Sequence, residues 1–271
     1  MRAATSQTAS PDIGIVVLSC DKYSDLWHVF FELFFRAWPD CPFPVYLLAN
    51  RETFTGPRVK TVLSIDDPDW STSIKKCLKQ IDHRHIWLFF DDVLLDRKIQ
   101  KEKIDRLVKF VAQMDPSYLR FSRFPRPDKR ISDHFGKCNV GSMYRTSLFG
   151  IWKREVLLDL LREGESAWTF EHNGLARSSK YPDFYGVYEE YFSYIHAVER
   201  GVWSRAAVAR VHRLGCKVDL DRRQIMSKIQ HRKYQKTLIR TFIFNRTPSR
   251  FKPLLTKLAS LSRKVAGNTL G

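Results

Sequence analysis

The sequence has few cysteines, and they form no recognisable motif. Its five cysteines are odd in number and widely spaced, without a CxxC pair. This pattern argues against a disulfide-stapled scaffold or a zinc ribbon, and it suits a reducing compartment. No apolar run approaches the roughly 20 residues that a membrane-spanning helix needs. Residues 1–11 are polar and small, so we expect a disordered leader without the apolar core of a signal peptide.

The short motifs of several large enzyme classes are also missing. The sequence has no GxGxxG of dinucleotide-binding folds, no GxxxxGK[ST] P-loop, and neither HExxH nor GxSxG. These absences exclude P-loop ATPase chemistry and argue against dehydrogenase chemistry. Nucleotide-sugar chemistry needs none of these motifs and stays open.

Acidic residues are absent from the C-terminal end of the chain. The net charge of the whole sequence is +17, yet residues 205–271 hold 17 Lys/Arg and only two acids, and none follows Asp221. Residues 1–204 are therefore close to neutral, and the end of the chain is polycationic. Any binding to nucleic acid would have to lie in this basic segment.

What the first half does contain is an alternation of short β-branched runs and amphipathic helical patterns. We expect strands at 13–19, 44–50, 59–65, 86–90 and 118–122. We expect helices at 26–38, 69–81, 100–114 and 153–162, and a polar loop at 125–137. Such alternation predicts an α/β fold in which a mostly parallel sheet is flanked by helices. Ligands of these folds bind beyond the carboxyl ends of the strands.

Acidic residues stand at two of these strand ends. Asp21 follows the first strand, and Asp91 and Asp92 directly follow the apolar run 86–90. Asp21 could accept a hydrogen bond from a base or a ribose. Mg²⁺ or Mn²⁺ prefers one or two carboxylates together with phosphate oxygens, so the pair could hold a metal ion and a diphosphate. An Asp-Asp dipeptide fits the capping of a turn as well.

Three blocks of the sequence resemble bacterial glycosyltransferases of the GT-A type. They are IGIVVLSCDKYSDLWHVFF at 13–31, DWSTSIKKCLKQI at 69–81 leading into IWLFFDDVLL, and IWKREVLLDLLREGESAWTFE at 151–171. The resemblance covers about residues 13–210, in the family's order. It is greatest to enzymes of surface-polysaccharide (O-antigen, lipopolysaccharide or capsule) synthesis, including galactofuranosyltransferase-like members. It implies a GT-A-like catalytic domain at 12–215, with a DxD-like metal site at Asp91–Asp92. Because the pair reads Asp-Asp-Val, which acid contacts the metal stays open.

The resemblance also implies an inverting transfer from a nucleotide-diphospho-sugar, with a UDP-sugar favoured, to a lipid-linked glycan. Ser19, Asp21 and Tyr23 would bind the donor together with the acidic pair. Inverting transfer needs a base near the acceptor hydroxyl. Glu171 is our candidate, because Trp168 beside it could stack on a sugar and desolvation would raise its pKa.

Other residues near these blocks are weaker candidates. Glu171 could instead be a surface residue of a helix-start turn, and Trp168 a core residue. The remaining expected acceptor contacts are His172, Glu189 and Glu190, of which the two glutamates are rival bases. The cations Arg145 and Lys153 could bind the diphosphate.

The basic end of the chain, 216–271, is expected to be a helical tail. From residue 222 onward, apolar residues alternate with Lys and Arg, a pattern typical of helices that lie on anionic membranes. Packing on the catalytic domain, or counterion release on nucleic acid, would use the same pattern. We favour the membrane, with no nucleic-acid partner, because the resemblance implies lipid-linked acceptors. Pro248 and Pro253 suggest a break between two helices.

These observations predict a cytoplasmic glycosyltransferase that is peripheral on the inner face of the cytoplasmic membrane. Two alternatives stay open. One is a nucleotidyltransferase on a similar sheet, which would normally carry a glycine-rich basic loop after the first strand. The other is a protein without enzymatic activity whose tail binds nucleic acid.

Overall fold

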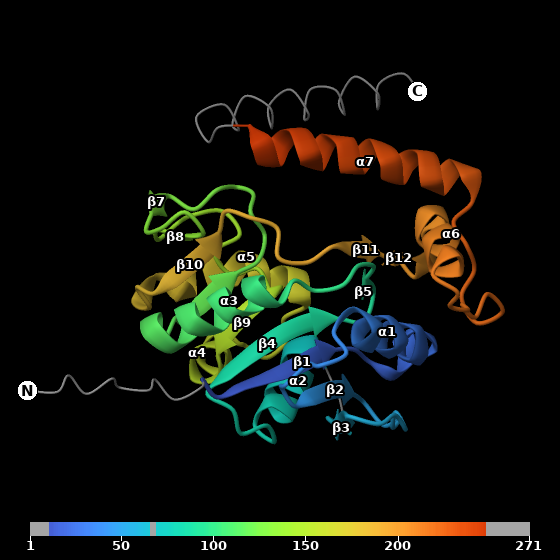
Figure 1. Ribbon diagram of the computed structural model, residues 1–271, viewed down its shortest axis with the longest axis horizontal. Helices are drawn as coiled ribbons and strands as arrows, with labels where there is room; N and C mark the ends of the chain where they lie inside the picture. The colour runs from blue at the N-terminus through green and yellow to red at the C-terminus, as the bar shows by residue number, and fades with distance from the viewer. Residues whose placement is uncertain (1–10, 66–68, 248–271) are drawn as a thin grey trace, which may run out of the picture. The chain divides into compact units, whose positions relative to one another are not determined.

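The computed structural model describes residues 11–65 and 69–247 (Figure 1). The expected leader, apart from residue 11, and the expected helix break at Pro248 and Pro253 lie outside the described residues. The chain divides into two compact units, Met1–Ile225 and Met226–Gly271. Residues 216–225 therefore group with the first unit, whereas the charge pattern assigned them to the tail.

A nine-stranded sheet organises the first unit, in the order β3-β2-β1-β4-β9-β6-β10-β8-β7. Its strands are β1 (Ile13–Leu18), β2 (Val45–Ala49), β3 (Val59–Leu63), β4 (His85–Phe90), β6 (Tyr118–Arg120), β7 (Lys129–Arg130), β8 (Phe135–Lys137), β9 (Gly150–Lys153) and β10 (Phe184–Val187). The strands β1 to β4 are parallel, as are β6 and β10, whereas β9 and β8 run antiparallel to their neighbours. This confirms the α/β class with a mostly parallel sheet. The expected loop at 125–137 is wrong in part, because β7 and β8 form one edge of the sheet there.

The two central strands are apolar along their whole length because both of their faces are covered. In β1 every residue is buried, and β4 is buried up to Phe90. The two strands pair in register, with Leu18 opposite Phe90. Ser19 and Asp91, the residues that follow, are therefore brought side by side at the carboxyl edge of the sheet.

Helices cover both faces of the sheet (Figure 1). On one face lie α1 (Ser24–Ala37), α3 (Lys101–Met114) and α6 (Arg205–Arg213), whose apolar residues share a core with Ile15 and Trp87. On the other lie α2 (Trp70–Leu78), α4 (Arg154–Leu160) and α5 (Ala167–Arg177), packed with Val16 and Leu88. The alternation of side chains along β1 and β4 thus sorts two separate cores. Short 3₁₀ turns, η1 (Asp21–Tyr23) and η2 (Ser178–Lys180), follow β1 and α5.

Side-chain caps set where two helices of the second face, α2 and α5, begin. The Asp69 carboxylate accepts the Thr72 N–H (2.9 Å) at the start of α2. At the start of α5, the Ser166 Oγ accepts the Thr169 N–H (3.1 Å), which satisfies an otherwise orphaned donor. These caps fix the first turn of each helix.

Two small antiparallel pairings bring the chain back to the acidic pair. The strand β5 (Val93–Leu95) pairs antiparallel with β11 (Tyr194–His196), and β12 (Val198–Glu199) pairs with β13 (Val202–Trp203). The Ala197 N–H donates to the Asp92 carbonyl (2.7 Å). The segment after β10 therefore lies against the residues that follow β4.

The second unit contains α7 (Lys228–Arg246), which begins at a capping box made by Ser227 and Gln230. None of its residues is buried. Across the described ranges, no helix is long and apolar enough to cross a bilayer.

Candidate active site

A cavity of about 460 Å³ opens at the carboxyl ends of β1, β2 and β3. Its wall is mostly apolar and includes a few polar side chains, among them Ser19, Asn50, Ser64, Trp70 and Ser73. Small-ligand sites have this size and composition, and the carboxyl edge of a parallel sheet is where they are expected. Of the expected donor-binding residues, Ser19 lies in the wall of this cavity.

Asp91 lies beside the cavity and is almost fully buried, with 5% of its surface exposed. Its Oδ2 accepts a hydrogen bond from the Ser19 hydroxyl, and the Ser19 Oγ in turn accepts one from Trp27 Nε1 (2.6 Å). Burial, reinforced by the neighbouring charge of Asp92, raises the pKa of the Asp91 carboxyl well above its usual range. The carboxyl is thus held by a side chain that also faces the cavity.

Asp92 is half-buried and differs from Asp91 in its contacts. Burial, together with the nearby Glu199, raises its pKa to about 6. Within the described residues, its carboxylate accepts no hydrogen bond from any other residue. Asp92 therefore has oxygens available for a ligand.

The acidic pair fits one class of metal ion and not another. In the part of the chain that the structure describes, no group of three or more His, Cys, Asp or Glu side chains could hold a metal ion. A zinc site built from three or four protein ligands does not fit. Mg²⁺ or Mn²⁺ held by one or two carboxylates and by phosphate oxygens does fit. Asp91 and Asp92 are the residues that would hold it.

Asp21 and Tyr23 lie in the η1 turn after β1. The Asp21 carboxylate accepts backbone N–H bonds from Asn50, Arg51 and Glu52 at 2.9–3.1 Å. It therefore fixes the loop after β2, and the expected bond to a base or ribose would compete with these contacts. The Tyr23 phenol is half-buried, and burial raises its pKa.

Arg223 is a residue of this site that the sequence did not reveal. Its Nε and Nη2 bond to both oxygens of Asp25 (2.8 and 2.7 Å), and its guanidinium lies 4.4 Å from the centre of the Tyr23 ring. Its charge opposes the rise in pKa of both Asp91 and Asp92. No local pattern marks it among the neighbouring basic residues, because its partner is almost 200 positions away.

Glu171 lies in the second turn of α5, at the same carboxyl edge of the sheet. Its Oε1 accepts the Leu148 N–H (2.8 Å), and Leu148 immediately precedes β9, whose Gly150 pairs with Leu88 of β4. Burial raises the pKa of Glu171. The residue is thus half-buried inside a helix, not a surface residue of a turn.

The aromatic residues beside Glu171 have opposite environments. Trp168 is 82% exposed, whereas Phe170 is fully buried and contacts the rings of Trp70 and Trp152. His172 is exposed. Trp168 is therefore not a core residue, and its indole is open to a ligand.

The two rival bases are occupied by ion pairs. Glu189 contacts Arg106 (3.0 Å) and His134 (2.8 Å). Burial acts to raise its pKa, but the hydrogen bond and charge of Arg106, together with the charges of His134 and Lys103, lower the pKa overall. Glu190 pairs with Arg123 (2.9 Å). A carboxylate held in this way is a weaker base, which argues against catalysis by Glu189.

The two cations that we considered for the diphosphate are placed elsewhere. Arg145 is buried and donates to the carbonyls of Ser178 and Tyr181. Lys153 ends β9 opposite His85, the first residue of β4, and pairs with Asp115 (2.9 Å). Lys153 is therefore at the amino edge of the sheet, and both expectations are wrong.

Comparisons with known proteins give only distant structural similarity. No protein-family model and no curated protein matches the sequence. The chain is similar in structure to S. aureus TarS 1–349 in complex with UDP, with 11% identity, a TM-score of 0.48, and 90% of this chain and 77% of that chain covered. It is also similar to the mannosyltransferase PcManGT from Pyrobaculum calidifontis in complex with GDP-Man and Mn²⁺, with 14% identity, a TM-score of 0.47, and 93% and 70% covered. We therefore infer function from this chain's own side chains.

Proposed function

We propose that this chain is a glycosyltransferase that uses a nucleotide-diphospho-sugar donor. One observation carries the proposal: Ser19 lines a nucleoside-sized cavity and also donates to Asp91, beside the uncommitted carboxylate of Asp92. A base and ribose in the cavity would leave the diphosphate at the acidic pair. UDP-sugars are the first donors to test.

The acidic pair would hold Mg²⁺ or Mn²⁺, which neutralises charge on a diphosphate leaving group when bound. Ser19 and Trp27 orient the Asp91 carboxyl through their hydrogen bonds. Arg223 is fixed by Asp25 and stacks on Tyr23, so it keeps the turn after β1 in place.

Glu171 would accept the proton of the acceptor hydroxyl. The hydroxyl oxygen bonds to the anomeric carbon, the bond from that carbon to the diphosphate oxygen breaks, and the proton goes to Glu171. Its raised pKa makes the carboxylate a stronger base. Because the Leu148 N–H occupies Oε1, Oε2 is the oxygen left for the proton. Trp168, three positions earlier on α5, would stack on the acceptor sugar.

A nucleotidyltransferase is not favoured by any feature of the site. Such an enzyme would normally place a glycine-rich basic loop after β1, and the segment Ser19–Tyr23 contains no glycine. The products distinguish the two reactions. A transferase releases a nucleoside diphosphate, whereas a nucleotidyltransferase releases pyrophosphate.

Donor binding can be tested by thermal shift with UDP, UDP-sugars and GDP-mannose, each with and without Mn²⁺. We expect stabilisation by at least one nucleotide-sugar that depends on Mn²⁺ and is lost in Asp92→Ala. A ligand at about 100 times its Kd raises stability by about 2.7 kcal/mol, which is readily measured. Metal-independent stabilisation that survives in Asp92→Ala would overturn the role of the acidic pair.

We also propose that α7 binds an anionic membrane surface, where a lipid-linked glycan acceptor of surface-polysaccharide synthesis would be met. Helical spacing puts Leu238, Ile239, Phe242 and Ile243 on one face, and each is exposed. The helix carries six Lys/Arg and no acid, and each cation near such a surface adds about 1 kcal/mol. Its charge matches anionic headgroups, and its apolar face matches the acyl boundary.

Vesicle sedimentation tests this proposal with the full chain. We expect binding to vesicles of phosphatidylglycerol and phosphatidylcholine that weakens with salt and is lost in Ile239→Ser/Ile243→Ser. The matched control is Ile131→Ser, an exposed isoleucine of the first unit. Binding that ignores lipid charge, or tighter binding to a DNA duplex than to vesicles, would contradict the membrane role.

A further inference from the structure

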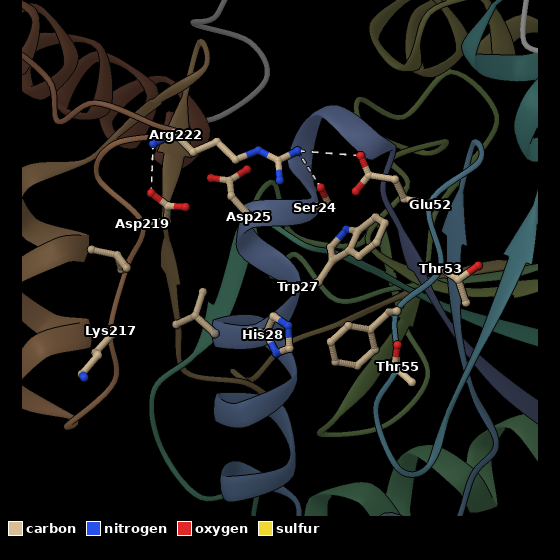
Figure 2. A pocket seen from close by; sticks show the side chains of 13 residues that line it. Ser24, Asp25, Trp27, His28, Glu52, Thr53, Thr55, Lys217, Asp219 and Arg222 are labelled. Carbon is tan, nitrogen blue, oxygen red and sulfur yellow. Dashed lines mark hydrogen bonds and ion pairs between the residues drawn. The ribbon is translucent and has the colours of Figure 1, made fainter.

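A second cavity, of about 600 Å³, lies at the start of α1 (Figure 2). Its wall comes from three segments: residues 24–29, residues 52–55 and residues 217–222. Figure 2 shows Arg222 extending from the last segment across the first turn of α1 toward Glu52. The donor cavity is lined by α2, which covers the opposite face of the sheet. The two cavities are therefore distinct.

The acidic side chains in this wall are already partnered. Asp25 forms the two-bonded pair with Arg223, Asp219 accepts the N–H of Arg222 (2.9 Å), and Glu52 lies 3.9 Å from the Arg222 guanidinium. Carboxylates whose charge is already balanced by arginine or by backbone N–H groups bind a metal cation weakly. The cavity is accordingly not a metal site.

Other polar groups of the wall are uncommitted. Among the described residues, the side chains of His28, Thr53, Thr55 and Lys217 form no hydrogen bond or ion pair. Two aromatic residues, Trp27 and Phe54, also line the wall, and the His28 ring packs edge-on against Phe54 with centroids 5.1 Å apart. Hydroxyl, imidazole and ammonium groups in one wall with aromatic rings suit a ligand with an apolar face and many hydroxyls. A saccharide has this chemistry, and one or two sugar units fit a cavity of this volume.

We propose that this cavity binds a saccharide unit of the glycan that the enzyme extends, at a site separate from the donor cavity. The proposal rests on the proposed glycosyltransferase function. A glycan held there as well as at the transfer point gains affinity through effective concentration, so longer acceptors are favoured over short ones.

One wall residue connects this cavity to the donor site. Trp27 lines it, and its Nε1 donates to the Ser19 Oγ (2.6 Å), whose hydroxyl donates to Asp91. Trp27 is only 3% exposed, so a saccharide in the cavity would reach a small part of its ring.

Ligand-observed NMR on the full chain, without nucleotide or metal, tests the site. The probes are the methyl glycosides of galactose, glucose, N-acetylglucosamine and rhamnose. We expect saturable binding of at least one, with Kd in the range of about 1–10 mM. Thr53→Val/Thr55→Val and Lys217→Met should each weaken it by about fivefold, since each removes hydrogen-bond donors. Lys98→Met, an exposed lysine outside this wall, is the matched control and should bind as the wild type does.

The outcomes separate this site from the proposed function. Asp92→Ala should bind the saccharide normally, because the acidic pair takes no part in this assay. Saccharide binding without any nucleotide binding would reject the donor site and leave this cavity standing. The saccharide site is overturned if no probe binds saturably. It is also overturned if Thr53→Val/Thr55→Val and Lys217→Met both bind the probe as tightly as the wild type does. Competition by UDP alone would make the cavity a nucleotide site, which also overturns it.

Discussion

Two adjacent pairs of acids, Asp91–Asp92 and Glu189–Glu190, look alike in sequence and differ completely in the structure. The first pair follows a buried strand. Asp91 is buried and accepts a hydrogen bond from the Ser19 hydroxyl, whereas the carboxylate of Asp92 accepts none from another described residue. The second pair is bound by Arg106, His134 and Arg123. The pKa is raised for both aspartates and lowered for Glu189.

The difference shows what distinguishes a candidate site from a structural ion pair. Two neighbouring carboxylates that are buried without a full counter-charge lower the stability of the folded state. Such a pair therefore indicates a ligand that supplies positive charge. Carboxylates already satisfied by arginine have no such need. The contrast in burial and in partners therefore makes the first pair the candidate site, and the substitutions below test that inference.

The largest effect is expected at the first pair. Asp92→Ala removes a proposed metal ligand, so metal-dependent transfer or donor hydrolysis should fall at least about 1,000-fold. The measurement is nucleoside diphosphate release with Mn²⁺ and a nucleotide-sugar. If the turnover of Asp92→Ala is within a few-fold of the wild type, Asp91–Asp92 is no more a catalytic site than Glu189–Glu190 is.

The next effect is expected at the proposed base. Glu171→Gln should lower kcat about 100-fold and leave the Kd of the donor nearly unchanged. Because burial raises the pKa of Glu171 and the base must be ionised, activity of the wild type should decline as pH falls through that raised pKa. A pH–rate profile of kcat, measured at saturating Mn²⁺ and donor so that Asp91 and Asp92 stay ionised, checks the sign. If the acidic limb of that profile persists in Glu171→Gln, another residue is the base.

A smaller effect is expected from Arg223→Lys, which keeps the charge and loses the paired bonds to Asp25. Donor affinity should fall about tenfold, because the turn that carries Tyr23 is less well fixed. Arg222→Lys is the matched comparison, since the Arg222 guanidinium bonds to Ser24 and to the Asp21 carbonyl of the same turn but not to Asp25. Equal losses in the two variants would mean that Arg223 has no special role at the donor site.

The smallest effect on turnover is expected at the second pair. Glu189→Gln should change kcat less than about threefold and destabilise the fold by about 1 kcal/mol, a drop of about 2–4 °C in Tm. The folded-state pKa of Glu189 lies below the unfolded value. Its contribution is therefore present at neutral pH and lost as pH falls through the folded-state pKa, so the two proteins should converge in acid. A large loss of kcat with unchanged Tm would make Glu189 catalytic.

The sequence was sufficient for the parts of the site that depend on local pattern. The apolar runs that became β1 and β4 end where Ser19 and Asp91 begin, and the parallel-sheet rule brought these ends to one edge. Side-chain partners that are distant in the sequence could not be predicted from it. The local sequence around Arg223 does not predict its partner Asp25, and that around Glu189 does not predict Arg106. Both contacts join segments that only the tertiary packing brings together. The role of Asp21 in fixing the loop after β2 likewise depends on backbone N–H groups about 30 positions later.

The most direct test of the central claim is Mn²⁺ electron paramagnetic resonance during a titration of the full chain with UDP. We predict that wild-type protein removes free Mn²⁺ from solution when UDP is present, with one ion bound per chain, and that Asp92→Asn does not. Equal uptake of Mn²⁺ by the wild type and by Asp92→Asn would contradict a metal and diphosphate site at the acidic pair.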